Sequence, residues 1–410
     1  MTTTTGSRTT TVGASAAAHS VPTVTPLSIG PIVVDPPVVL APMAGVTNPA
    51  FRTLCARFGA LLGVSEMITA RGLVERHRTT FAMVTRAPDA DIHSVQLYGV
   101  DPTVVGLAVR ILVDEVGADH VDLNFGCPAA KVTRKGGGAA LPAHPVLLGR
   151  ILTAAVDAAG DVPVTMKMRM GLDDDLRTDT TAARIAADAG VAAIALHART
   201  AAQLYSGDAR WEAIAELKSV VAQHSPHTPV LGNGDIFTGD DAVRMMAATG
   251  CDGVVVGRGC LGRPWLFAEL TAALAGQPAP SNPTLGEIVA TMVDHLDLLC
   301  AHTPSGGRPG VEVTAVRDFR KHVGWYLQAV PVGSAARQAM MAAETRNELV
   351  DELHRALDTL GAAFVPDPLA RRQPRGHTHG PRPIALPPKW LDHPDDPEPP
   401  AGADSLVSGG

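Results

Sequence analysis

A cysteine on a polar loop is the residue of this 410-residue chain that is best suited to chemistry. Cys127 stands in the segment Asn124-Phe-Gly-Cys-Pro128, where glycine and proline flank it. An unperturbed thiol has a pKa near ~8.5, so it is mostly protonated at neutral pH and can serve as a proton donor as well as a nucleophile. The other four cysteines lack this setting, and free cysteines are most often small core residues. We therefore predict that Cys127 is catalytic.

Two glycine-rich segments could together bind a phosphate group. One contains Asn233, Gly234 and Asp235, and the other contains Gly257, Arg258 and Gly259. Backbone N–H groups of such turns bind phosphate oxygens, and the Arg258 guanidinium can bind two of them at once. Either segment alone could be a plain turn, but the pair favours a phosphate site.

Three further polar side chains follow apolar runs. Lys167 could place positive charge beside a bound anion, although a lysine there could also simply reach solvent. Gln96 could hydrogen-bond the amide edge of a ring, or it could be a satisfied buried amide. His197 could hold a phosphate or a ring oxygen, and Arg199 follows it on the same loop. A lone histidine is more often structural, so its neighbour is what favours a functional role.

These polar residues follow eight short apolar segments, and a helix-like stretch comes after each segment. The segments are Pro37–Ala41, Leu61–Ser65, Ser94–Leu97, His120–Leu123, Val162–Met168, Ala192–Leu196, Pro229–Leu231 and Gly253–Val256. Nearly continuous apolar runs predict strands buried on both faces, as in a parallel sheet. Eight such units predict an α/β fold, a closed (β/α)8 TIM barrel with its chemistry at the C-terminal ends of the strands. A doubly wound sheet would instead need a glycine-rich dinucleotide fingerprint after the first strand, and none is present.

The rest of the chain divides into three further regions. We expect the barrel over residues 31–275 and, after a proline-rich break, a small all-α helical domain over residues 284–362. The Thr/Ala-rich residues 1–30 and the proline-rich residues 366–410 are expected to be disordered tails.

Composition limits the partners and the compartment. The net charge of −7 excludes a nucleic-acid binder that works by bulk charge, so any RNA contact must use local basic patches. Five cysteines without CxxC spacing argue against a disulfide framework or a zinc site, and they favour a cytoplasmic location. No apolar run reaches the ~18 residues of a membrane helix, so no membrane partner is expected.

Several motifs resemble those of the tRNA-dihydrouridine synthases, in particular the bacterial branch. The strongest is the segment from Val121 to Val132 with Lys135-Gly-Gly-Gly-Ala139. Ala41-Pro-Met-Ala-Gly45, Lys167-Met-Arg169, His197-Ala-Arg-Thr200, Tyr205-Ser-Gly207 and the two glycine-rich segments occur in the family's order. The resemblance extends over roughly residues 38–360.

The resemblance implies a flavin mononucleotide (FMN) barrel that takes electrons from NADPH or NADH and reduces uridines in tRNA to dihydrouridine. Cys127 would donate a proton, and Asn124 and Arg199 would contact the uracil. The implied FMN contacts are Pro42, Met43 and Ala44 along the flavin, Gln96 and Lys167 at its ring with His197 nearby, and Asn233, Gly234, Asp235, Gly257 and Arg258 at its phosphate end.

The resemblance also implies that the helical domain grips tRNA. Arg317, Arg320 and Lys321 share one helical face by their spacing, which is a pattern suited to phosphate contacts. A solvated helix face is the alternative. No protein partner can be inferred from the sequence.

Three other functions remain open at this stage. The nearest is an FMN barrel that acts on a free pyrimidine, as dihydroorotate dehydrogenase does, but such an enzyme needs no basic helical domain. The others are a barrel reductase that uses nicotinamide alone and a non-catalytic RNA-binding protein, which would be colourless when purified.

Overall fold

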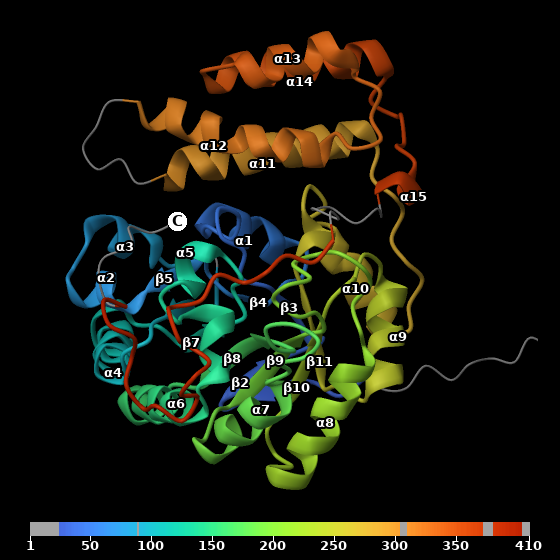
Figure 1. The fold of residues 1–410 in the computed structure, drawn as a ribbon. Coiled ribbons are helices and arrows are strands. Elements are labelled where there is room, and N and C mark those ends of the chain that lie inside the picture. Colours follow the sequence, from blue (N-terminus) through green and yellow to red (C-terminus); the bar gives the residue numbers. More distant parts are fainter. Residues whose placement is uncertain (1–23, 88–89, 304–309, 372–379, 404–410) are drawn as a thin grey trace, which may run out of the picture.

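The chain folds into a barrel of parallel strands with a helical domain over one end (Figure 1). The computed structural model describes residues 24–87, 90–303, 310–371 and 380–403. The strands form one sheet in the order β4-β3-β11-β10-β9-β8-β7-β6-β5. Their bounds are β3 (Val38–Leu40), β4 (Leu62–Gly63), β5 (Met67–Thr69), β6 (Ser94–Tyr98), β7 (His120–Phe125), β8 (Val164–Arg169), β9 (Ala193–His197), β10 (Val230–Asn233) and β11 (Gly253–Val256). Each of the eight predicted strand segments is present, and the predicted barrel is confirmed.

The second predicted segment, Leu61–Ser65, contains β4, and the short strand β5 that follows it was not predicted. The two strands lie at the two ends of the sheet order. The residues between them join the ends. The Val64 N–H donates to the Leu40 carbonyl, and the Ser65 N–H donates to the Ser94 carbonyl, both at 3.2 Å. These two bonds reach the neighbours on either side, so the sheet closes into a barrel.

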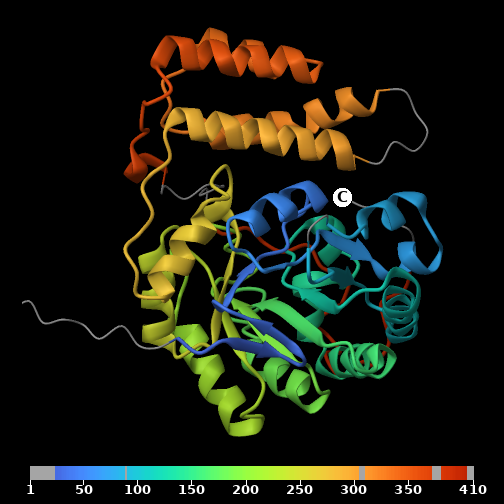
Figure 2. The same cartoon turned by 180° about the vertical axis from the view of Figure 1, so that it is seen from behind.

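Helices follow the strands and cover the outside of the barrel (Figures 1 and 2). Their bounds are α1 (Pro49–Arg57), α2 (Ala70–Val74), α3 (Arg78–Met83), α4 (Pro102–Ile111), α5 (Ala130–Thr133), α6 (Pro145–Ala159), α7 (Asp179–Asp188), α8 (Glu212–His224), α9 (Gly239–Thr249) and α10 (Leu266–Leu274). Short turns η1 (Leu112–Val116), η2 (Gly138–Ala143) and η3 (Arg258–Cys260) interrupt the connections. Helix α4 shows how the sequence sets these bounds: the Asp101 carboxylate accepts from the Thr103 and Val104 N–H groups, and Pro102 occupies the first turn.

A hairpin closes the lower end of the barrel. Strands β1 (Leu27–Ile29) and β2 (Ile32–Val34) pair antiparallel, and the side chains of Leu27, Ile29 and Val34 are buried against residues from the barrel strands. The expectation that residues 1–30 form a disordered tail is therefore wrong at its C-terminal limit, because burial of Leu27 and Ile29 stabilises the hairpin. Residues 1–23 lie outside the described part of the chain.

Four long helices occupy the region where the sequence predicts a helical domain. They are α11 (Leu285–His302), α12 (Val311–Tyr326), α13 (Gly333–Ala342) and α14 (Arg346–Leu360). Thr284 and Glu287 form a capping box that starts α11. The domain packs on α1 through a shared apolar cluster that includes Ala50 and Leu54. Among the described helices, none combines the length and apolar character that crossing a lipid bilayer requires.

The C-terminal region differs from the expected disordered tail. After α15 (Pro368–Arg371), residues 380–403 run along the outside of the barrel (red in Figure 1). The physical reason is one aromatic residue: Trp390 is only 5% exposed and belongs to the main apolar cluster of the barrel. Residues 372–379 and 404–410 lie outside the described part of the chain.

Candidate active site

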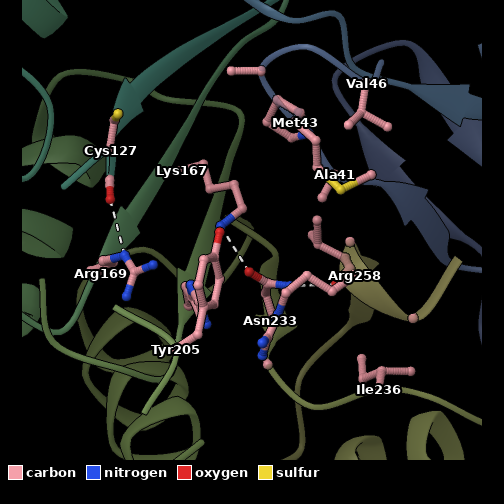
Figure 3. Close-up of a pocket in the computed structure, with 18 of the residues that line it drawn as sticks. Ala41, Met43, Val46, Cys127, Lys167, Arg169, Tyr205, Asn233, Ile236 and Arg258 are labelled. Carbon is pink, nitrogen blue, oxygen red and sulfur yellow. Dashed lines mark hydrogen bonds between the residues drawn. The ribbon is translucent and has the colours of Figure 1, made fainter. Parts of the chain in front are cut away.

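The C-terminal ends of the strands surround a cavity of about 490 Å³ (Figure 3). All residues that the sequence analysis assigned to the cofactor line it, together with Cys127 and Asn124. These cofactor residues are Pro42, Met43, Ala44, Gln96, Lys167, His197, Asn233, Gly234, Asp235, Gly257 and Arg258. Residues separated by more than two hundred positions therefore meet at one rim, because parallel strands end on the same side of the barrel.

Two amide side chains connect the cavity to the backbone of Cys127. The Asn124 carbonyl oxygen accepts from the backbone N–H groups of Gly126 (3.0 Å) and Cys127 (2.9 Å). The Asn124 amide nitrogen donates to Gln96 Oε1 at 2.9 Å. Asn124 thus fixes the start of the cysteine loop, because its carbonyl oxygen accepts both of these backbone hydrogen bonds.

A buried carboxylate, Asp122, orients these amides. The Gln96 nitrogen donates to Asp122 Oδ2 at 2.7 Å, and the Thr165 hydroxyl donates to Asp122 Oδ1 at 2.6 Å. Since that hydroxyl is already donating, His120 Nε2 must donate to it, which leaves His120 Nδ1 to accept from Ser94. Burial raises the pKa of Asp122 to about 6, against the hydrogen bonds and the Lys167 charge that lower it.

The Cys127 thiol is half-buried at the cavity wall. Burial raises its pKa, while the backbone N–H of Ala129 and the charges of Arg169 and Lys131 act in the opposite direction. The thiol therefore stays protonated at neutral pH. Arg169 holds the same loop through a 3.0 Å hydrogen bond from its Nε to the Gly126 carbonyl (Figure 3).

Lys167 projects into the cavity from β8. Its Nζ donates to Asn233 Oδ1 at 2.8 Å, and the Asn233 amide nitrogen donates to the Val255 carbonyl (Figure 3). Burial and the nearby Arg169 charge lower the Lys167 pKa to about 7, although Asp122 raises it. The charge of Lys167 consequently depends on what else occupies the cavity, because an anion would favour the protonated form.

His197 ends β9 and lines the same cavity, where it is 8% exposed. Burial, followed by the charges of Arg169 and Lys167, holds its pKa well below the usual value. The imidazole is therefore neutral and offers one donor and one acceptor.

Arg258 supplies a cation at the predicted phosphate end. Its guanidinium lies 4.1 Å from the centroid of the Tyr205 ring and 3.3 Å from Asp235 Oδ1. Gly234 has a φ of +135°, and a Cβ there would lie 2.6 Å from the Ala209 Cβ. Glycine is therefore required beside this cation.

Arg199 does not occupy the position expected of a uracil contact. It is 2% exposed and lies outside the cavity lining. Its guanidinium donates to the Gly207 carbonyl and to Asp235 Oδ2, both at 2.6 Å. These bonds direct it toward the loop after β9, so its contribution is to hold that loop and Asp235.

The cavity residues that were not assigned roles from the sequence include Met67, Arg169, Tyr205 and Trp325. Arg169 and Tyr205 stand inside the motif segments quoted above, so the motifs carried a signal for them. Trp325 comes from α12 and reaches the cavity only because the helical domain docks over the barrel, which no local pattern indicates.

The three basic residues expected on one face of α12 have different surroundings. Arg317 pairs with Glu344 and is 60% exposed. Arg320 donates to the Ala343 carbonyl at 2.8 Å, toward the connection between α13 and α14. Lys321 pairs with Asp318, and its Nζ lies 4.0 Å from where a Cβ of Gly45 would be, above the barrel rim.

The sequence is similar to a family of known enzymes over most of its length. The family model for dihydrouridine synthase (Dus) matches residues 39–361. A protein of Mycobacterium tuberculosis (strain H37Rv), described as a "probable tRNA-dihydrouridine synthase", is 52% identical over 393 residues, which cover 94% of this chain and 97% of the relative. The tRNA-dihydrouridine synthase B of Xanthomonas campestris pv. campestris is 40% identical over 343 residues, covering 84% of this chain and 99% of the relative. The chain therefore belongs to the dihydrouridine synthase family.

Proposed function

We propose that this protein is a flavin-dependent oxidoreductase that reduces the C5=C6 bond of uridines in tRNA to give 5,6-dihydrouridine. Membership of the family supports the reaction, and the half-buried, protonated Cys127 thiol at the cavity wall is the observation that carries it. We place the protein in the cytoplasm, where tRNA is its substrate and its cysteines remain reduced.

The residues around the cavity fit FMN. One wall is apolar and contains Ala41, Pro42 and Met43, which suits a flat ring. Arg258 and the bare backbone at Gly234 suit a phosphate group. The volume of about 490 Å³ lies in the ~300–1,000 Å³ range of small-molecule sites.

Four residues of the cavity, Cys127, Lys167, Gln96 and Asn124, then have defined tasks. When bound, the flavin supplies to C6 of the uracil a hydride that comes from NADPH or NADH. Cys127 gives its proton to C5, so one hydride and one proton convert the double bond into a single bond. Lys167 stabilises negative charge at the ring, and Gln96 and Asn124 hydrogen-bond the polar edges of ring and base.

The substrate must reach this cavity as an unstacked base. A uridine inside a helical stack cannot present C5 to a thiol in the wall of this cavity, so it has to leave the stack first. Trp325 at the mouth offers a ring face for it. Arg317, Arg320 and Lys321 of α12 are the proposed phosphate contacts, of which the 60% exposed Arg317 is the most accessible.

Reduction of unmodified tRNA by the purified protein tests the proposal. The protein should bind FMN, oxidise NADPH and form dihydrouridine in the tRNA, as measured by nucleoside mass spectrometry. Cys127→Ala should keep FMN binding and NADPH oxidation but lose about 100-fold or more of product formation. Full product formation by this variant would remove Cys127 from the mechanism.

Free uridine and uracil are the matched substrates for the alternative function. Reduction of these compounds as fast as tRNA would favour an enzyme of free pyrimidines. Activity confined to tRNA, weakened by Arg317→Ala with a shallower salt dependence, would support the proposed role of the helical domain.

A further inference from the structure

The described C-terminal residues 380–403, here called the strap, connect the loop after β9 with the outer helix α6. At one end the Arg382 N–H donates to the Ala202 carbonyl, in the loop after β9, at 2.8 Å. Further along, Arg150 of α6 donates to the Pro397 carbonyl and pairs with Glu398. The strap therefore passes from the β9 loop to α6 along the side of the barrel that carries the cysteine loop (Figure 1).

Trp390 anchors the strap between these ends. It is 5% exposed, whereas the next residue, Leu391, is 46% exposed. The indole N–H donates to the Ala140 carbonyl at 3.1 Å. His144 Nε2 donates to the Trp390 carbonyl at 2.6 Å, and the two rings stack with their centroids 3.6 Å apart.

The indole ring lies directly on the turn that supports Cys127. A Cβ on Gly136 would be 2.8 Å from Trp390 Cη2 and 3.0 Å from Pro400 Cγ, so the strap covers bare backbone. Two residues later, a Cβ on Gly138 would be only 2.5 Å from the Cys127 carbonyl oxygen. The strap therefore contacts one end of the segment Gly136–Gly138, and the Cys127 carbonyl contacts the other end.

Two hydrogen bonds continue this contact to the cysteine. The indole N–H binds the Ala140 carbonyl, and the N–H of the adjacent Ala139 donates to the Cys127 carbonyl at 3.0 Å. The Cys127 peptide is held at its other end by Asn124. Asn124 therefore fixes the Cys127 backbone from the barrel interior, and Ala139 fixes it from the turn beneath the strap.

We propose that Trp390 is a positioning residue, which fixes the direction of the Cys127 thiol through the turn 136–139. The predicted effect on product formation rests on the proposed function, whereas the predicted effect on the reactivity of the Cys127 thiol does not. Glycines make this turn deformable, so an external contact is needed to give it one conformation.

Trp390→Ala tests the proposal, with Leu391→Ala as the matched control on the exposed neighbour. The first readout is the rate at which iodoacetamide alkylates Cys127 in the tRNA-free protein, followed by peptide mass spectrometry. Cys300, in the helical domain, serves as the internal reference. We expect a several-fold change in the Cys127 rate with Trp390→Ala and none with Leu391→Ala or at Cys300.

The second readout separates the two steps of turnover. Trp390→Ala should lower kcat for dihydrouridine formation about tenfold while FMN binding and the rate of NADPH oxidation without tRNA stay within twofold. Trp390→Phe, which keeps an aromatic ring beside His144 but lacks the outer indole atoms at Gly136, should recover only part of that loss.

Equal alkylation rates and equal kcat for Trp390→Ala and Leu391→Ala, both folded by circular dichroism, would overturn the proposal and leave the strap as a stabilising element only. If Trp390→Ala does not fold, Pro400→Ala removes the smaller contact with Gly136 and should shift the alkylation rate in the same direction. If the wild-type protein forms no dihydrouridine, the proposed function fails, and the alkylation rates still decide the role of Trp390.

Discussion

Two regions of the molecule bury ionisable side chains in different ways. Inside the barrel, Asp122 accepts hydrogen bonds from Gln96 and Thr165, and His120 uses both of its ring nitrogens. Between α1 and the helical domain, His295 has one hydrogen bond within the described part of the chain, with the Tyr326 hydroxyl at 3.2 Å. Neither ring nitrogen of His322 has a hydrogen-bond partner among the described residues.

The difference shows what each buried group contributes. In the barrel network the donor and the acceptor of each hydrogen bond are defined, so the network fixes which atoms Gln96 and Asn124 present to the cavity. At the domain interface, the two histidine rings lie edge to face with their centroids 4.4 Å apart, and they contact Phe51 and Phe319. They act there as small aromatic rings, which requires them to be uncharged.

The largest expected effect comes from breaking the barrel network. Asp122→Ala removes one acceptor from each of two buried donors, Gln96 and Thr165. We expect a loss of about 3 kcal/mol in the free energy of unfolding. Product formation should fall about 100-fold because the amides that hold Cys127 lose their orientation. Urea unfolding and kcat on tRNA measure the two effects.

The exposed Asp114→Ala on η1 is the control for that variant, and it should change stability by less than about 0.5 kcal/mol. Asp122→Asn preserves the side-chain volume and one acceptor, so its losses of stability and of kcat should lie between those of Asp122→Ala and Asp114→Ala. Wild-type kcat in Asp122→Ala would show that the network is structural and does not orient the site.

The barrel and its rim could be predicted because their signals are local. Apolar runs such as Gly253–Val256 place the strands, and a polar residue directly after a run, such as Lys167 or His197, must lie at the barrel mouth. A carboxylate inside an apolar strand also carried a signal. Asp122 lies between Val121 and Leu123, and since successive side chains of a strand point to opposite faces, its carboxylate must lie on the other face of β7 from these two apolar side chains.

What the sequence did not indicate depends on contacts between distant segments. Arg199 turns to Gly207 and Asp235 because of the path of one loop, so its position after β9 could not reveal its direction. Trp325 enters the cavity through domain docking. Trp390 stands in a proline-rich segment whose composition resembles that of disordered chains, and one buried ring is enough to reverse that prediction.

Acid should act in opposite directions on the buried histidines and on the buried carboxyl group of Asp122. Burial lowers the pKa of His295 to about 3, so the unfolded chain binds a proton below pH ~6.5 that the folded protein does not. His295 alone should therefore lower the free energy of unfolding by about 2 kcal/mol between pH 7 and 5. His322, whose pKa is also well below its usual value, acts in the same direction.

Asp122 works against this loss. Its folded pKa of about 6 is above the ordinary carboxyl value of 3.8, so its contribution to stability is largest below 3.8 and disappears as the pH rises through 6. Urea unfolding of the wild type from pH 7 to 5 should show a net loss, since His120 and His197 in the barrel are also held neutral. A flat profile would contradict the assignment of the buried histidines as neutral.

The smallest effect is expected from the interface at neutral pH. His322→Met keeps a similar volume and removes no hydrogen bond, so the free energy of unfolding at pH 7 should change by about 1 kcal/mol or less. At pH 5 the same variant should be more stable relative to the wild type than at pH 7, because it no longer excludes a proton on folding. The exposed His354→Met on α14 is the matched control for the change of residue type. If His322→Met instead destabilises the protein by as much as Asp122→Ala, the interface histidines must have specific partners, and the contrast between the two regions disappears.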